Sequence, residues 1–391
     1  MPARFVSAST AFSRLLSGLF ILLLATLLSP AAAQTVFSAK ASGPTGPTGL
    51  FRADQGTVVP VNTGLPYNEF AFVGRDGRTV TLSSSDPAQP NEPSTDLFLH
   101  DLVTGQTRKL HDNVTEPLPD GSYLFASPQF SRASDNGQRV AFVNLLASSN
   151  DQQQGGAYRQ LLVLRGSDGF LLSSAEIGNG SMYDFYNSEF VGISWVPGSD
   201  QFVTPAYVDV VDNTGRPTAA AGLVMFARDS TGEYRRTGTL TQPQVFSDGL
   251  NVIVQTHAWP SFSPDGSLLA FFRMTYPSAV MDQPVETELL MIDASGSGWV
   301  MASFNPGVIG MGVSWSANGQ QLVFSVAEQS YSNGLFPPTG EPHTAEVFTL
   351  DLSSNEFGRV PGVTSGFFPN GGGAAGGGGG ETIFRSNFER Q

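Results

Sequence analysis

Four histidines and no cysteine limit the chemistry open to this chain of 391 residues. Without a thiol, thiolate nucleophiles and thiolate metal sites are excluded. His257 stands just before a predicted inner strand, where an imidazole could act as a base or hold a metal at a channel mouth. A structural role for this side chain is the stronger interpretation. Structural roles are also expected for His100, inside a predicted strand, His111, just after one, and His343, in a long loop.

Oxygen donors gather in two polar segments. One contains Asp209, Asp212 and Asn213, and the other is the loop 86–96, DPAQPNEPSTD. Several carboxylate and amide oxygens in one place suit Ca²⁺, although neither segment has the spacing of an EF-hand loop. The simpler interpretation is a polar β-turn and a solvated loop, with bound calcium as the alternative.

Three tryptophans, Trp195, Trp259 and Trp315, stand on predicted first strands of repeated units. Such rings could form a stacking platform for sugars, but packing between neighbouring sheets is the commoner use of buried aromatic residues. Three aspartates end predicted strands just before turns and are expected to cap those turns: Asp101, Asp293 and Asp351.

These residues are embedded in short predicted strands. Residues 257–274, HAWPSFSPDGSLLAFFRM, predict a β-hairpin with strands over 259–263 and 268–272. In its turn, Pro264 presets φ, Asp265 can accept a backbone hydrogen bond and Gly266 supplies a positive φ. The 44 glycines and 26 prolines favour many short strands over helices.

The hairpin pattern recurs along the chain, which indicates a repeat array. Each of five units contains four predicted strands, and a ring of four-stranded sheets is a β-propeller. Three predicted strands within 36–62 and one within 364–370 remain outside these units. We predict that they pair as a sixth blade, so the expected fold is an all-β, six-bladed propeller of antiparallel blades. The repeated turn glycines are Gly77, Gly137, Gly266, Gly319 and Gly371, with the third unit's turn near Ser199.

Residues 1–33 predict a secretory signal peptide. Arg4 and Arg14 form a positive region before the apolar run from Leu15 to Leu28, and three alanines offer a cleavage site after Ala33. The run is shorter than the roughly 20 residues that span a bilayer, so we expect cleavage, no transmembrane anchor and a periplasmic or secreted product. Cleavage moves the formal charge from −14 to −16, which disfavours nucleic-acid binding.

The segments PSFSPDGSLLAFF, SWSANGQQLVFS and PQFSRASDNGQRVAFV resemble the WD40-like repeat of TolB-type propellers, in which an SPDG turn links the two inner strands. A D-L-x-x-x-D-L-x-T-G pattern, Asp96 to Gly105, resembles the third strand of that repeat. The resemblance covers about residues 34–371 and implies the fold. TolB has a smaller α/β domain before its propeller that this chain lacks, so TolB's partners are not implied. Related propellers carry a hydrolase domain, for which this chain has neither a G-x-S-x-G motif nor enough residues after its last repeat.

The connections between second and third strands of the blades emerge on one side of a propeller. In the five full units these connections are long, which suggests a face that binds a protein or glycan ligand. The alternative is that they fold down over the blades. They cover residues 83–95, 146–158, 206–221, 275–287 and 327–344. Five of their side chains suit a recognition surface: Tyr158, Tyr276, Met281, Tyr331 and Phe336.

A glycine-rich segment, 371–380, predicts a flexible linker between the propeller (34–370) and a tail over 381–391. The tail, ETIFRSNFERQ, resembles sorting tails of exported proteins in some Gram-negative bacteria. A strand at 382–384 added to the sixth blade is a compatible alternative. We expect a monomeric, exported, non-catalytic binding scaffold. The alternative is an enzyme with a central-channel site, such as a metal-assisted glycan lyase or hydrolase, in which carboxylates would gather around His257.

Overall fold

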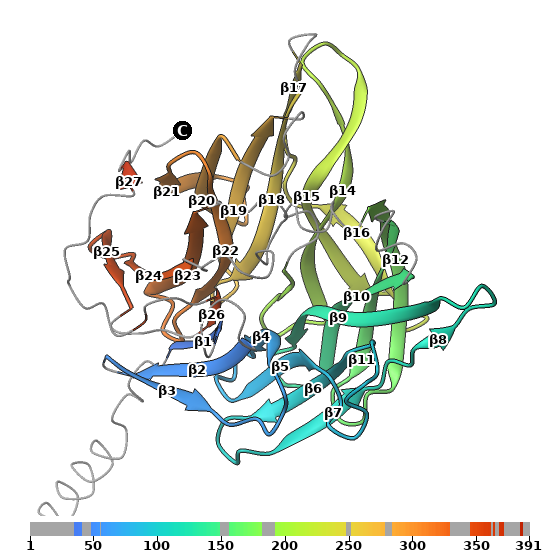
Figure 1. Cartoon of the computed structure of the whole chain (residues 1–391). Coiled ribbons are helices and arrows are strands. Elements are labelled where there is room, and N and C mark those ends of the chain that lie inside the picture. Colours follow the sequence, from blue (N-terminus) through green and yellow to red (C-terminus); the bar gives the residue numbers. More distant parts are fainter. Residues whose placement is uncertain are drawn as a thin grey trace, which may run out of the picture.

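The computed structural model describes residues 35–40, 48–54, 56–148, 156–181, 192–247, 252–277, 284–328, 345–360, 363, 367–370 and 384–385. Within these ranges the chain forms six antiparallel sheets arranged around a common centre (Figure 1). The predicted all-β, six-bladed propeller is confirmed. No helix in the same ranges is long and apolar enough to cross a membrane.

The first three blades follow one another along the chain. The first contains β4 (Glu69–Val73), β5 (Thr79–Ser84), β6 (Asp96–Asp101) and β7 (Thr107–His111). The second contains β8 (Glu116–Pro117), β9 (Tyr123–Ala133), β10 (Arg139–Ser148), β11 (Gly156–Arg165) and β12 (Leu171–Ser181). The third contains β13 (Ser194–Trp195), β14 (Gln201–Val211), β15 (Pro217–Arg228) and β16 (Tyr234–Thr239).

The remaining blades include both ends of the described chain. The fourth contains β17 (Val245–Ser247), β18 (Val252–Phe262), β19 (Leu268–Pro277), β20 (Glu286–Asp293), β21 (Gly298–Phe304) and β27 (Phe384–Arg385). The fifth contains β22 (Val308–Trp315), β23 (Gln321–Glu328), β24 (Ala345–Asp351) and β25 (Glu356–Arg359). The sixth contains β26 (Phe367–Asn370), β1 (Thr35–Lys40), β2 (Thr48–Asp54) and β3 (Thr57–Val61).

Strands from the two ends of the propeller segment share the sixth sheet, as predicted. Val36 of β1 stands opposite Asn370 of β26, and Ser38 stands opposite Phe367. The alternative of a tail strand at 382–384 on the sixth blade is wrong. β27 pairs with β21 at the outer edge of the fourth blade, and the stretch 371–383 is long enough for the chain to reach that blade.

In the second, fourth and fifth blades, the turn between the first and second strands is built from a serine and an Asp or Asn two residues later. In the fourth blade, Asp265 accepts hydrogen bonds from the Ser263 hydroxyl and the Ser267 amide, and Ser263 Oγ accepts one from the Leu268 amide. Gly266 closes the turn with φ of 75°, a conformation that favours glycine. The second and fifth blades repeat this arrangement at Ser134–Asn136 and Ser316–Asn318.

Each of the first five blades has a residue with positive φ on its innermost segment. It lies seven positions before the turn residue at 77, 137, 199, 266 or 319. Four of these positions lie at register shifts between the first and second strands, so they are β-bulges. A bulge re-aims the side chain that it carries. The five residues are Phe70 (48°), Phe130 (51°), Gly192 (94°), Trp259 (57°) and Gly312 (129°).

Candidate functional site

The centre of the ring is filled by aromatic side chains from these bulges. Phe70 packs edge to face on Phe130 with ring centroids 4.9 Å apart, and Phe130 packs in the same way on Trp259 at 5.4 Å. These residues belong to the first, second and fourth blades. Since the second and fourth blades are not neighbours, their innermost strands meet only at the axis. All three side chains are at most 3% exposed, so they form a plug, which we define as Phe70, Phe130 and Trp259.

A second layer extends the plug. The ring centroids of Phe72 in the first blade and Trp259 in the fourth are 6.3 Å apart, although these two blades lie on opposite sides of the six-bladed ring. The guanidinium of Arg132 stands 4.4 Å from the centre of the Phe72 ring and donates to the main-chain oxygen of Val73. Burial and the positive charge of Arg75 lower the pKa of Arg132 to about 9, so this buried cation stays charged at neutral pH.

Arg75 links blades on the side of the ring where the turns between first and second strands lie. It follows β4, yet its guanidinium donates to the main-chain oxygens of Trp195 in the third blade and of Phe262 and Ser263 in the fourth, at 3.1 to 3.3 Å. Its Nε also lies 3.2 Å from Asp135 Oδ1 in the second blade. One side chain therefore joins the first blade to three others.

The three predicted inner-strand tryptophans pack between blades. The indole of Trp195 donates across to the second blade, that of Trp315 to the fourth, and that of Trp259 to the fifth. The interpretation as packing residues is confirmed for all three, because each indole nitrogen bonds to main chain. The acceptors are the oxygens of Arg132 (3.0 Å), Ser261 (2.8 Å) and Gly310 (2.9 Å), in that order.

His257 is buried in the fourth blade. Its Nδ1 lies 2.7 Å from the hydroxyl of Thr241, its ring packs edge to face on Phe271, and its strand partner is Arg273. Burial, together with the charge of Arg273, lowers the pKa of His257 to about 3. The carboxylate beside Arg273 is Glu288, which pairs with that arginine. This environment holds a neutral, structural imidazole.

The other histidines have local partners. His100 Nδ1 lies 2.9 Å from the Thr107 hydroxyl, and burial lowers the pKa of His100. The ring of His111 packs on Phe142, and burial likewise lowers the pKa of His111. His343 lies outside the described residues.

The Asp209 segment folds as a hairpin turn. The Thr214 hydroxyl and the amides of Thr214 and Arg216 donate to Asp212 Oδ1, and the bond from the Thr214 hydroxyl is the largest of the effects that lower the pKa of Asp212. Asn213 uses both its amide atoms on main-chain groups of Ser247, while Asp209 is an exposed residue of β14. The buried Oδ2 of Asp212 accepts no hydrogen bond from the described residues and lies 3.4 Å from Arg216 Nε. One carboxylate oxygen of Asp212 and the amide oxygen of Asn213 are thus engaged by the protein itself.

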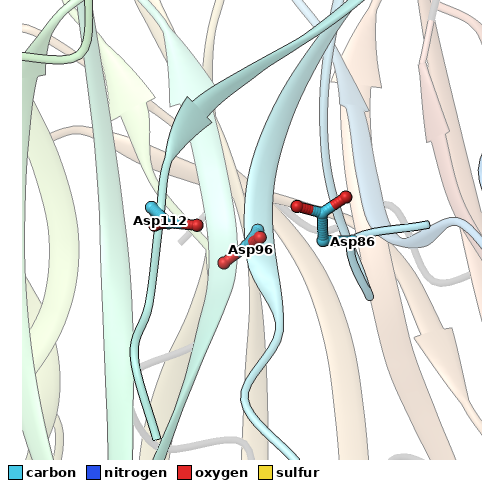
Figure 2. A group of neighbouring side chains, drawn as sticks. All are labelled: Asp86, Asp96 and Asp112. Atoms are coloured by element: carbon cyan, nitrogen blue, oxygen red, sulfur yellow. The ribbon is translucent and has the colours of Figure 1, made fainter. Parts of the chain in front are cut away.

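The loop 86–96 contributes to a cluster of three carboxylates, Asp86, Asp96 and Asp112 (Figure 2). Their ligand atoms lie within 4.8 Å of one another, and this is the only group of three or more His, Asp or Glu side chains of such closeness among the residues that the structure describes. The ammonium of Lys109 lies among them, 2.7 Å from Asp86, 3.0 Å from Asp96 and in contact with Asp112. The protein's own cation therefore occupies the place that a metal ion would take.

The two inner carboxyls of this cluster respond differently to their surroundings. Burial raises the pKa of Asp96, which is 4% exposed. The hydrogen bond from Lys109 lowers the pKa of Asp86.

The three aspartates at strand ends are turn caps, as predicted, because each accepts two main-chain amides: Asp101, Asp293 and Asp351.

The structure describes two of the five predicted recognition residues, Tyr158 and Tyr276. The prediction that Tyr276 lies on the surface is wrong. Tyr276 lies in β19, is 1% exposed and donates to Met274 Sδ, because the strand continues through this position. Tyr158 lies in β11, opposite Leu146, so it too belongs to a strand. Met281, Tyr331 and Phe336 lie outside the described residues.

Much of the predicted loop sequence is strand. β14 and β15 pair without interruption from Gln201 with Ala227 to Val211 with Pro217, so residues 206–221 form the end of a long hairpin. This hairpin and the β17–β18 hairpin project together beyond the ring (Figure 1). We call the described parts of these two hairpin ends, residues 205–222, 244–247 and 252–256, the arm.

The arm is packed on the core that continues from the second and third blades, and it has its own cross-links. Val208, Val210 and Ala220 of one hairpin and Val245 of the other are at most 5% exposed and belong to one cluster. Asn213 ties the tips together through Ser247, and Gln242 donates to the main-chain oxygen of Asp209 at 2.9 Å. The arm is therefore packed on the inside and held at both ends.

One row of side chains beside the polar tips of the arm is apolar. Phe246 of β17 stands opposite Ile253 of β18, which stands opposite Pro277 of β19. Phe246 is 42% exposed, Ile253 is 36% exposed and Val211, at the neighbouring tip, is 65% exposed. We call Phe246, Ile253 and Pro277 the apolar row.

Sequence reasoning missed both the plug and the arm. A usable signal for the plug was present in the sequence. An aromatic residue or glycine recurs seven positions before each of the turn residues at 77, 137, 199, 266 and 319. The arm had a weaker signal in the alternation of Val208 and Val210 with polar neighbours.

No family model matches this chain. No curated protein matches it either. Among solved structures, the propeller is similar to TolB from Acinetobacter baumannii, with a TM-score of 0.52 and 14% identity over 87% of this chain and 66% of that one. This likeness shows a shared fold.

Two further structures superpose less well. An oligogalacturonate lyase in complex with manganese gives a TM-score of 0.42 at 12% identity, covering 81% of this chain and 71% of that one. A putative TolB from Agrobacterium tumefaciens gives 0.42 at 15% identity, covering 74% and 95%.

Proposed function

We propose that this protein is an exported binding scaffold that holds a protein partner on its arm. The observation that carries the proposal is the apolar row, Phe246, Ile253 and Pro277, which lies in register across three strands of a packed projection. Exposed apolar side chains that gather on one rigid surface mark interaction sites more often than single exposed ones do. The signal peptide predicted at residues 1–33 supports export of this scaffold to the periplasm or out of the cell.

The chemistry of the row favours a protein over a glycan. Sugars stack on flat aromatic faces, whereas Ile253, Pro277 and the nearby Val211 offer aliphatic surface. Phe246 supplies one large ring of the kind that anchors protein interfaces. The chain's formal charge of −14 further favours a partner with a basic surface, since opposite potentials speed association.

The axis supports the same conclusion. A channel enzyme needs a space in which substrate meets converging acid and base groups. Here Phe70, Phe130 and Trp259 occupy the axis, and His257 has Thr241 and Phe271 as neighbours. The buried, partnered imidazole and the filled axis favour a binding role over catalysis.

The test is a pull-down from cell-envelope extract with the mature chain and with a Phe246→Asp, Ile253→Asp double variant. A partner that binds the apolar row should be lost or weakened about tenfold or more, because buried aromatic anchors carry much of an interface's free energy. Binding of the identified partner should then be measured with purified proteins.

The matched control is Val103→Asp, at a residue that is 75% exposed on the β6–β7 turn, on the side of the ring opposite to the arm. This variant should bind like the natural chain. Equal retention by the arm variant, or equal loss in both variants, would contradict the proposal. Urea unfolding should show that the double variant keeps its stability within about 1 kcal/mol, as expected for exposed positions.

A further inference from the structure

The apolar row borders an acidic side chain. Two residues before Pro277 on β19, Thr275 lies on the same face of the sheet and stands opposite Glu286 of β20. Pro277 and Glu286 are therefore diagonal neighbours on that face, about 7–8 Å apart. Glu286 is exposed, and Val285 next to it is 47% exposed. A carboxylate thus stands at the end of the row that lies farthest from Phe246.

The basic residue nearest to Glu286 in the sequence is engaged elsewhere. Arg273 of β19 pairs with Glu288, two residues further along β20, and its Nε lies 2.7 Å from Glu288 Oε2. Both side chains of this pair are mostly buried. The ion pairs among the described residues do not include Glu286. Its carboxylate is therefore available to a cation of a partner.

Negative charge is concentrated in the part of the sequence that forms this surface. From Thr237 to Val360, which contains β17 to β25, the sequence has eleven acidic and two basic residues, a formal charge of −9 out of −14 for the whole chain. Both basic residues, Arg273 and Arg359, already pair with glutamates. In the first three blades, residues 69–236, twenty acidic residues stand against twelve basic ones. The fourth and fifth blades therefore attract a cationic partner more strongly than the first three do.

The row and the carboxylate together specify the chemistry of an occupant. The row crosses three strands, a distance of about 10 Å, and each residue of an extended chain advances about 3.3 Å. Two or three apolar residues therefore cover the row, and a basic residue two positions beyond them reaches Glu286. The anionic surface of a lipid bilayer would be repelled, because it carries the same charge as these two blades.

We propose that the partner held on the arm presents a basic, apolar segment. Its apolar side chains pack on Phe246, Ile253 and Pro277, and its lysine or arginine pairs with Glu286. This inference rests on the proposed function, because it assigns the partner's chemistry at the same apolar row. Glu286 is then the residue that selects a cationic segment over a neutral one of equal apolar content.

Peptide binding tests this assignment. The probe is a fluorescein-labelled peptide, Lys-Lys-Leu-Phe-Leu-Lys-Lys, titrated with the full mature chain at low salt and followed by fluorescence anisotropy. Two companion peptides replace every lysine by glutamate, or every leucine and phenylalanine by serine. The natural chain should bind the first peptide about tenfold or more tightly than either companion.

Two variants separate the parts of the site. Glu286→Gln should weaken binding of the lysine peptide about threefold and reduce its dependence on salt, since exposed ion pairs contribute modestly. Phe246→Ser with Ile253→Ser removes apolar surface without adding charge and should weaken binding about tenfold or more. The matched control is Glu116→Gln, at an exposed glutamate of β8 in the second blade, which should bind like the natural chain.

The outcomes distinguish this inference from the proposed function. If the serine double variant loses the lysine peptide and Glu286→Gln keeps it, the row binds without selecting charge, and the inference is overturned while the proposed function stands. If the double variant keeps the peptide but loses its partner in the pull-down, again only the inference fails. Retention by the double variant in both assays means that the proposed function fails too. Equal binding of the lysine peptide and its serine companion, or no binding of either, would also overturn the inference.

Vesicles test the other occupant of an exposed apolar row. The mature chain should stay in the supernatant when vesicles of phosphatidylethanolamine and phosphatidylglycerol are sedimented. Sedimentation with the vesicles that is abolished by Phe246→Ser with Ile253→Ser would assign the row to a lipid surface and overturn the inference.

Discussion

The axis and the arm of this propeller are built from the same kinds of residue and expose them in opposite ways. At the axis, Phe70, Phe130 and Trp259 are buried against one another. On the arm, Phe246 and Ile253 keep more than a third of their surface exposed. Near the axis, the guanidinium groups of Arg75 and Arg132 also donate hydrogen bonds to main-chain oxygens.

This contrast separates stability from recognition. Substitutions at the axis should weaken folding because they leave cavities or unpaired polar groups. Substitutions on the outer face of the arm should leave folding nearly unchanged and act on binding. The variant at Phe246 and Ile253 tests the arm side of this division, and four measurements on buried groups follow in order of expected effect.

Trp259→Ala should have the largest effect on folding. It removes a side chain that is 2% exposed, together with the indole hydrogen bond to Gly310, so the free energy of unfolding should fall by about 3–5 kcal/mol. Urea unfolding followed by circular dichroism measures this. Phe170→Ala, at a residue that is 61% exposed, is the control and should cost less than about 1 kcal/mol. Similar losses in the two variants would refute the plug as a stabilising element.

Arg75→Met should come next. Removal of the guanidinium leaves the main-chain oxygens of Trp195, Phe262 and Ser263 without this donor, at a cost of about 2–3 kcal/mol. Arg78→Met is the control, since Arg78 pairs with Asp101 at the surface, where such pairs contribute about 1 kcal/mol or less. If both variants unfold at the same urea concentration, Arg75 does not join the blades energetically.

His257 should make stability depend on pH. The unfolded chain binds a proton at this residue below about pH 6.5, whereas the native pKa is about 3. The free energy of unfolding is therefore highest above pH 6.5 and falls toward pH 3, by about 1.4 kcal/mol per pH unit from this group.

His257→Gln should remove that part of the acid dependence. The measurement is the slope of unfolding free energy between pH 6 and pH 4.5 in both proteins, since their carboxylates contribute equally and cancel in the difference. Identical slopes would mean that the native imidazole is accessible to protons, as a catalytic base at an open channel would be.

Lys109→Met should have the smallest effect in the absence of metal, about 1 kcal/mol, because Asp86 and Asp112 are partly hydrated and the buried Asp96 keeps the Asn113 amide as a donor. The variant presents Asp86, Asp96 and Asp112 without their ammonium, so millimolar Ca²⁺ should raise its melting temperature. The natural chain should respond neither to Ca²⁺ nor to a chelator. A chelator that lowers the melting temperature of the natural chain would show that a metal shares the cluster with Lys109.

Local chemistry explains what sequence reasoning could predict. The turns around Gly137, Gly266 and Gly319 are specified by the residues within them, so their position and the number of blades follow from spacing alone. The turn caps Asp101 and Asp351 are equally local.

Tertiary contacts explain what it missed. A positive φ at Phe130 or Trp259 opposes the preference of an aromatic residue, and it persists because the ring is packed from several blades. Tyr276 stays in a strand because Val254 pairs with it, a partner 22 positions earlier. The arm depends on Asn213 meeting Ser247, which no short pattern records.

The tryptophan contacts between blades have a consequence for how this protein can change over time. An indole N–H that bonds to a main-chain oxygen, as Trp195 does with Arg132 and Trp315 with Ser261, makes no demand on the side chain of the acceptor residue. Neighbouring blades can therefore diverge while the joint between them stays intact, and the architecture outlasts any common sequence signature.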